Sequence, residues 1–158
     1  MVEDSGWGAG TRSSDTRDLS RILVAFDGSE SAVRACRVAA NLAKNCGSDV
    51  TVLHIIPSLS IFTSPLADEY YAHHQREAKK LAEIAASLVA KEGVAETRRE
   101  IIRARNSVVQ TIVEYAAEKK IDLIVIGSRG PGGFRGMLMG SVSNGVVTHA
   151  HCPVLVVK

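Results

Sequence analysis

The sequence has few aromatic residues, little net charge and no long apolar run, and each absence argues against a class of function. Aromatic residues make up 4% of the 158 residues, and the formal net charge is only +2. A nucleic-acid interface relies on a basic face or on exposed rings for base stacking, so the composition supports neither. No apolar run approaches the roughly 18 residues that span a bilayer, and residues 1–20 lack the apolar core of a secretory signal. We therefore expect no nucleic-acid partner and no membrane partner.

Paired cysteines are also missing. The three cysteines, Cys36, Cys46 and Cys152, are an odd number without paired spacing, which predicts a reducing, cytoplasmic compartment. His149 and His151 lie close to Cys152 in the sequence, but no second ligand pair with zinc-finger spacing accompanies them. We expect no metal site built from protein side chains alone.

The residues that are present suit one folded domain after a polar leader. Hydrophobic residues make up 46% of the chain and charged residues 23%, as in ordinary globular proteins. Residues 1–19 show no periodicity and predict a flexible N-terminal tail, and residues 20–158 predict a single domain. In that domain, apolar runs alternate with helical patterns. Strands are expected over 21–26, 49–56, 95–104, 121–126 and 153–157, with helices over 29–45, 67–91, 141–150 and from a cap at Asn106 to about 116.

This alternation predicts an α/β fold, a doubly wound parallel sheet of five strands with helices on both faces. In such a sheet, ligands bind at the carboxyl ends of the strands, where the winding direction reverses. Two turns rich in glycine are expected there. One is Asp27-Gly28-Ser29 after the first strand, and the other begins at Gly127 after the fourth.

The stretch over 127–143 has the composition of a phosphate-binding loop that leads into a helix. Its glycines let the main chain approach an anion closely, and Gly140-Ser141 opens a helix whose free N–H groups favour negative charge. The side chains that could add hydroxyl donors or positive charge are Ser141, Ser143, Arg129 and Arg135. The stretch therefore predicts a nucleotide-binding protein.

Two common nucleotide motifs do not fit this stretch. The P-loop pattern GxxxxGK[ST] needs a lysine, and none occurs between Lys120 and Lys158. The dinucleotide pattern GxGxxG, counted from Gly130, meets Arg135 where its third glycine should stand. The dinucleotide pattern also belongs after the first strand of a fold, whereas this loop follows the fourth strand. The usual NTPase and dehydrogenase interpretations are thereby excluded.

The spacing resembles another signature. Gly127, Gly130 and Gly140-Ser141 are spaced as in the G-2x-G-9x-G-[S/T] motif of the universal stress protein family. The resemblance covers about residues 19–158, and its other segments are Ile22 to Ser29, Val50 to His54, Asp122 to Gly127 and His151 to Val157. It implies strand order 3-2-1-4-5. It also implies ATP binding, because family members with the intact signature bind ATP and those without it generally do not.

The resemblance further implies roles for individual residues. Asp27 would contact the ribose, and Ala25, Val50 and Ile126 would line the adenine pocket. The residues expected around the phosphates, with Mg²⁺ or Mn²⁺, are Gly127, Arg129, Gly130, Gly140, Ser141, Val142 and Ser143. The family also commonly forms homodimers by antiparallel pairing of the last strand, here Pro153 to Val157, and an apolar edge strand suits this.

Three functions remain open at this point. The first is an ATP-binding stress-response or regulatory module whose nucleotide changes its conformation or partners. The second is a slow ATP hydrolase, although the sequence offers no obvious base beside the loop, so no catalytic residue is named and a dedicated enzyme is not expected. The third is a dimeric adaptor or receptor for AMP or cyclic AMP.

Overall fold

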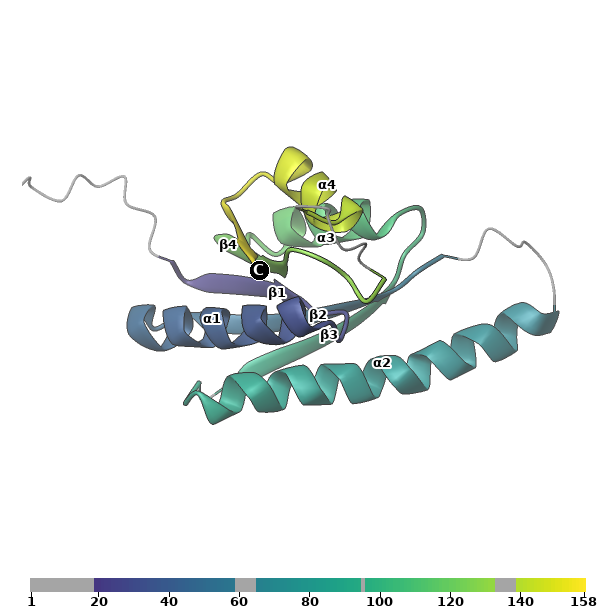
Figure 1. Cartoon of the computed structure of the whole chain (residues 1–158), viewed down its shortest axis with the longest axis horizontal. Coiled ribbons are helices and arrows are strands. Elements are labelled where there is room, and N and C mark those ends of the chain that lie inside the picture. The colour runs from purple at the N-terminus through teal and green to yellow at the C-terminus, as the bar shows by residue number, and fades with distance from the viewer. Residues whose placement is uncertain (1–18, 59–64, 95, 133–138) are drawn as a thin grey trace, which may run out of the picture.

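The computed structural model describes residues 19–58, 65–94, 96–132 and 139–158. The predicted tail up to residue 18 and the position of Arg135 lie outside the described residues. Helices and strands alternate along the described chain (Figure 1). The strands are β1 (Arg21–Ala25), β2 (Asp49–Ile56), β3 (Thr97–Arg103), β4 (Leu123–Gly127) and β5 (Val154–Val157). The helices are α1 (Glu30–Cys46), α2 (Pro65–Lys91), α3 (Val108–Glu118) and α4 (Ser141–His149).

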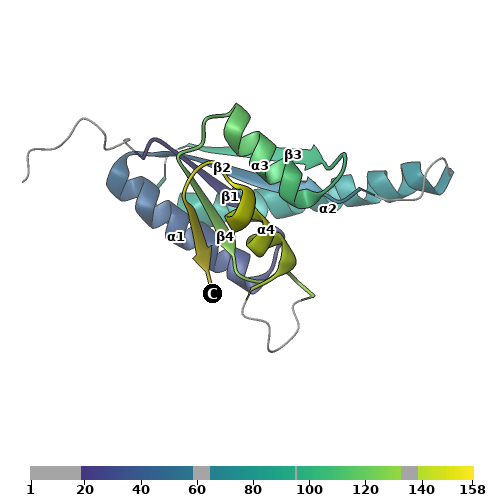
Figure 2. The same cartoon turned by 90° about the horizontal axis from the view of Figure 1, so that it is seen from above.

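The five strands form one parallel sheet in the order β3-β2-β1-β4-β5. This confirms the predicted fold class and strand order. Helices α1 and α2 cover one face of the sheet, and α3 and α4 cover the other (Figures 1 and 2). The direction of winding changes between β1 and β4, so the carboxyl ends of these neighbours frame a crevice.

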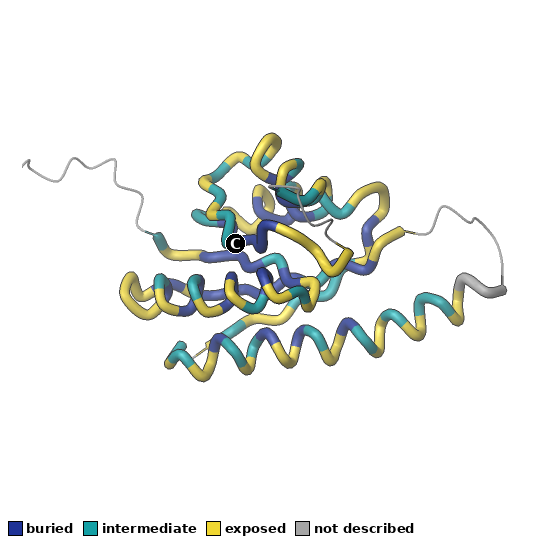
Figure 3. The backbone as a smooth tube through the Cα atoms, viewed as in Figure 1, coloured by how far each residue is buried: buried dark blue, intermediate teal, exposed yellow. Residues whose placement is uncertain are grey.

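The core lies on both faces of the central strands. In β1, Ile22 and Val24 pack with α1 and α2, whereas Leu23 between them packs with α3 and α4. All three are fully buried, because a central parallel strand is covered on both sides. Figure 3 shows the same pattern, with buried residues along the middle strands and exposed residues on the outer faces of the helices. None of the helices that the structure describes has the length and hydropathy needed to cross a bilayer.

The helix ends follow local side-chain chemistry, with one correction to the sequence prediction. Ser29 caps α1 by accepting the N–H of Ala32. The cap of α3 is Ser107 and not Asn106, because the Ser107 hydroxyl accepts the Gln110 N–H at 3.1 Å. The Asn106 amide instead lies 3.4 Å from the Gln110 side chain. Both residue types are good N-caps, so the sequence alone does not choose between adjacent candidates.

Candidate functional site

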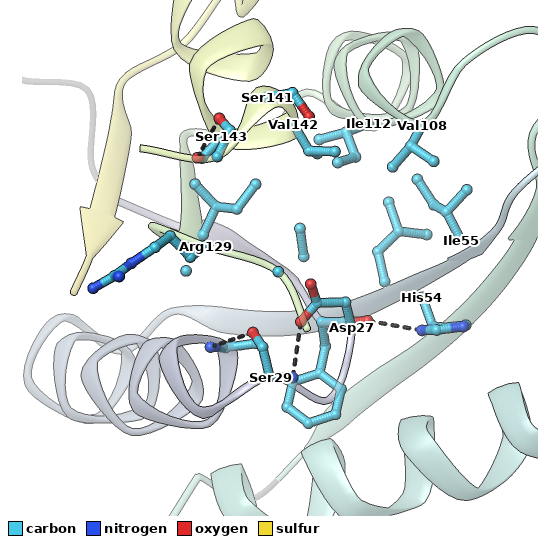
Figure 4. Close-up of a pocket in the computed structure, with 18 of the residues that line it drawn as sticks. Asp27, Ser29, His54, Ile55, Val108, Ile112, Arg129, Ser141, Val142 and Ser143 are labelled. Atoms are coloured by element: carbon cyan, nitrogen blue, oxygen red, sulfur yellow. Dashed lines mark hydrogen bonds between the residues drawn. The ribbon is translucent and has the colours of Figure 1, made fainter. Parts of the chain in front are cut away.

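A cavity of about 450 Å³ opens at the carboxyl ends of β1, β2 and β4. Helices α3 and α4 form its upper wall in Figure 4, and the turn after β1 forms its floor. This volume lies within the range of roughly 300–1,000 Å³ that is usual for small-molecule sites. The position is the one that the topology predicts for a ligand.

One end of the cavity is apolar. It is lined by aliphatic side chains from three strands and two helices: Leu53, Ile55, Val108, Ile112 and Val142, with Ala25 and Ile126 beside them. These side chains belong to the core cluster on the α3 and α4 face of the sheet. Register explains the meeting of the strand residues, because Ala25 pairs with Leu53 on one side and with Ile126 on the other. A slot of this kind accepts a planar, mostly apolar group such as an aromatic base.

The other end of the cavity holds the N-terminus of α4. Gly140 has the extended conformation of an N-cap, but it has no side chain to accept a main-chain N–H. Helices α1 and α3 are both capped by serine hydroxyls, so α4 is the exception among the described helices with an assigned cap. The first intrahelical hydrogen bond of α4 runs from the Asn144 N–H to the Gly140 carbonyl. The first turn of α4 has no acidic residue. The earlier N–H groups and the positive end of the helix dipole therefore favour an anion.

The carboxylate of Asp27 lies between these two ends. One oxygen, Oδ1, accepts the Ser29 N–H at 2.9 Å, which holds the side chain at the start of α1. The other oxygen lies beside Gly130, 3.0 Å from where a Cβ of that residue would stand. Figure 4 shows the carboxylate pointing into the cavity, whereas the Arg129 side chain points away from it, towards the end of β5. Because Gly130 has no side chain, the Asp27 carboxylate has room to lie beside it.

Hydrogen bonds join the two ends of the glycine-rich loop. The Ser128 carbonyl accepts the Gly140 N–H at 2.7 Å and the Ser143 hydroxyl at 2.9 Å. The Ser128 N–H donates to the Val157 carbonyl at 2.7 Å, which ties the same residue to β5. Ser143 is 2% exposed. Its hydroxyl therefore holds the loop closed, and its contribution to a ligand would come from its main-chain N–H.

Gly127 has a packing role that the sequence did not reveal. A Cβ at this position would lie 2.7 Å from the Ala32 nitrogen and 2.8 Å from the Ser31 carbonyl carbon, both main-chain atoms. The end of β4 therefore rests directly on the first turn of α1. Only glycine permits this approach, which brings the loop and the turn after β1 to the same place.

Comparison with known proteins agrees with this geometry. A family model described as the universal stress protein family matches residues 19–158. This chain belongs to the universal stress protein family. A relative, universal stress protein YxiE of Bacillus subtilis, is 34% identical over 150 residues, which cover 89% of this chain and 99% of the relative.

Two solved structures of universal stress proteins are similar to this chain, and their names describe complexes with a nucleotide. One, from Archaeoglobus fulgidus in complex with dAMP, has a TM-score of 0.67 at 31% identity and covers 90% of this chain and 100% of that chain. The other, in complex with cAMP, has a TM-score of 0.70 at 25% identity and covers 90% and 99% of the two chains. The universal stress protein fold is thus shared along nearly the whole chain.

Most of the residues predicted for a universal stress protein site line the cavity. They are Ala25, Asp27, Ile126, Gly127, Arg129, Gly130, Gly140, Ser141, Val142 and Ser143. Val50, which was predicted together with them, does not line the cavity. Val50 is the second residue of β2, pairs with Ile22 at the far end of β1, and is fully buried in the core below α1. Leu53, three residues further on, occupies the place beside Ala25.

Sequence reasoning also missed several lining residues. Val108 and Ile112 are one helical turn apart on α3, and their spacing signals only a helix face directed at the core. His54 and Ile55 stand at the end of β2, where the position in the strand could have indicated them. The His54 Nδ1–H donates to the Phe26 carbonyl at 2.8 Å, which fixes the ring at the edge of the cavity.

Proposed function

We propose that this chain is a regulatory universal stress protein that binds ATP in the cavity described above. The observation that carries the proposal is the uncapped N-terminus of α4, which stands at the polar end of a cavity whose other end is apolar. An apolar slot and an anion site within one cavity match the two halves of a nucleotide. Binding would then change the conformation of the loop or the partners of the protein.

The proposed contacts follow from the positions of the lining residues. The base would lie among Ala25, Leu53 and Ile126, and the ribose hydroxyls would bond to the Asp27 carboxylate, which is a hydrogen-bond acceptor. The phosphates would lie against main-chain N–H groups. The residues proposed to surround the phosphates are Gly127, Arg129, Gly130, Gly140, Ser141, Val142 and Ser143.

A divalent ion would depend on the nucleotide for most of its ligands. Within the described ranges, no three His, Cys, Asp or Glu side chains gather into a group that could hold a metal. Mg²⁺ typically binds through one or two carboxylates together with phosphate oxygens and water. Asp27, beside Gly130, could supply such a carboxylate, so the residues present fit Mg²⁺ or Mn²⁺ that arrives with ATP. The ion would neutralise phosphate charge.

AMP or cyclic AMP is the second candidate. It is favoured by the two similar structures, whose names give dAMP and cAMP as their ligands. Mass spectrometry of the compound released when the purified protein is denatured would distinguish the candidates, together with calorimetry using Mg-ATP, AMP and cyclic AMP. Release of ATP and tightest binding of Mg-ATP would support the proposal. Tightest binding of a monophosphate would favour the second candidate, and no binding of any of them would refute both.

We also propose a cytoplasmic homodimer that pairs through β5. This strand lies at one edge of the sheet and its Leu155 side chain is 36% exposed. An apolar edge strand presents unpaired main-chain N–H and C=O groups and tends to add another strand. The same strand of a second copy of the chain would pair with these groups. The three cysteines are all free thiols, in agreement with a reducing compartment.

A further inference from the structure

The side chain of Ser31 makes an unusual contact for a residue inside a helix. Ser31 lies in the first turn of α1 and is 5% exposed. Its hydroxyl donates to the Arg129 carbonyl at 2.6 Å, a residue 98 positions away, and also lies 3.4 Å from the Arg129 N–H. One buried hydroxyl therefore contacts both main-chain polar groups of Arg129, at the point where the loop leaves β4.

Two threonine hydroxyl groups in other helices behave differently. Thr111 and Thr148 each donate to the carbonyl four residues earlier in sequence, as hydroxyl groups in helices usually do. The capping of α1 is already provided by Ser29. The bond from Ser31 to the loop is thus required neither by helix chemistry nor by the cap.

The bond fixes the direction of one peptide group. The peptide that joins Arg129 to Gly130 is trans, as are all described peptides, so its carbonyl and its N–H point in opposite directions. Because the Arg129 carbonyl is turned towards Ser31 on α1, the Gly130 N–H points away from α1. The cavity and α4 lie on that side of the sheet (Figure 4).

The preceding peptide is held from the opposite face. The Ser143 hydroxyl, on α4, donates to the Ser128 carbonyl at 2.9 Å. Buried serines from helices on the two faces of the sheet therefore hold two successive peptides of the loop. Fixed main-chain N–H groups bind an anion more tightly than mobile ones, because they need no reordering.

We propose that Ser31 is a positioning residue for the phosphate end of the site, one that aims the Gly130 N–H at the ligand. The proposal rests on the proposed nucleotide-binding function. Without the hydroxyl, the peptide after Arg129 could rotate and present its carbonyl oxygen, which repels a phosphate. Only the fraction of molecules with the correct peptide orientation would then bind, and the apparent affinity would fall by that fraction.

The test compares Ser31→Ala with Ser48→Ala. Ser48 is a matched control, because it is also buried and its hydroxyl also donates to a main-chain carbonyl, that of Leu19, at the opposite end of the sheet. Titrations of Mg-ATP and of adenosine, followed by NMR, separate the phosphate end from the base end. From the free energy of one hydrogen bond, we expect Ser31→Ala to weaken Mg-ATP binding roughly three- to tenfold and to leave adenosine binding within about twofold. Ser48→Ala should change neither.

Each outcome decides the inference. Equal losses for Mg-ATP and adenosine in Ser31→Ala, or no loss for either, would overturn the role of Ser31 while the proposed function stands. If the wild-type chain binds neither compound, the proposed function itself fails. Thermal unfolding of each variant without ligand reports on folding. Should Ser31→Ala not fold, Ser31→Cys, which keeps the shape of the side chain but offers only a weak donor, allows the same comparison. The expected difference between the losses of Mg-ATP affinity and adenosine affinity is then smaller.

Discussion

Replacing Gly140 by aspartate should make the protein more stable and at the same time a poorer nucleotide binder. Gly140 has φ −73° and ψ 161°, an N-cap conformation that aspartate adopts without strain. A Cβ added there would lie 3.4 Å from its nearest neighbour, the Ser128 carbonyl oxygen, which is ordinary van der Waals contact. The new carboxylate would accept an N–H of the first turn of α4. It would therefore occupy the position proposed for a phosphate.

The two effects have different sizes. A side-chain cap and a negative charge at the positive end of the helix dipole together stabilise the ligand-free protein by about 0.5–1 kcal/mol. Loss of one hydrogen bond between an N–H and a charged phosphate weakens binding by about 1.5–3 kcal/mol, or roughly 10- to 150-fold. Repulsion between the carboxylate and the phosphates should weaken it at least about tenfold further.

Three variants separate these contributions by urea denaturation and by calorimetry with Mg-ATP. Gly140→Asn blocks the same N–H groups without adding charge. It should therefore lose the affinity that the hydrogen bond to phosphate provides, but not the further affinity that charge repulsion removes in Gly140→Asp. Gly140→Ala leaves the N–H groups free, so it should lower stability by about 0.5–1 kcal/mol and keep affinity near that of wild type. Wild-type affinity in Gly140→Asp, or an equal loss in Gly140→Ala, would refute the role assigned to the N-terminus of α4.

Three further predictions concern stability and assembly. Gly127→Ala should lower the free energy of unfolding by about 1–3 kcal/mol, since its Cβ would meet the main chain at Ala32, and an unchanged urea midpoint would contradict this. Burial raises the pKa of Cys36 from 9.0 to about 12, so above pH 9 the unfolded chain loses a proton that the folded chain keeps. The free energy of unfolding should therefore fall between about pH 9 and 12 more steeply in wild type than in Cys36→Ala, and parallel pH profiles would contradict it. Leu155→Lys should convert a dimer to a monomer in light scattering while circular dichroism shows that the chain stays folded, and a persistent dimer would exclude pairing through β5.

The fold could be predicted because its determinants are local and repeated. Short β-branched runs such as the one from Ile121 to Ile126 alternate with helical patterns, and this alternation admits few topologies. Helix boundaries were less certain where two suitable caps are adjacent, as at Asn106 and Ser107. The sequence contains both residues, but only the three-dimensional path of the chain determines which one has extended geometry.

The site could be predicted where a residue's position in the sequence fixes its position in space. Asp27 and Gly140 follow directly from strand and helix ends. Val50 could not be placed correctly, because the register of β1 against β2 decides which residue lies beside Ala25. Ser31 shows the other limit, since a hydroxyl that bonds 98 residues away leaves no local pattern in the sequence.

The most direct test is a crystal structure of the full chain grown with saturating Mg-ATP. We expect one nucleotide per chain, with the base between Leu53 and Ile126 and a phosphate oxygen about 3 Å from N–H groups of Ser141 and Val142. A nucleotide seated elsewhere, or one whose phosphates point away from α4, would contradict it. So would an empty cavity at saturating concentration.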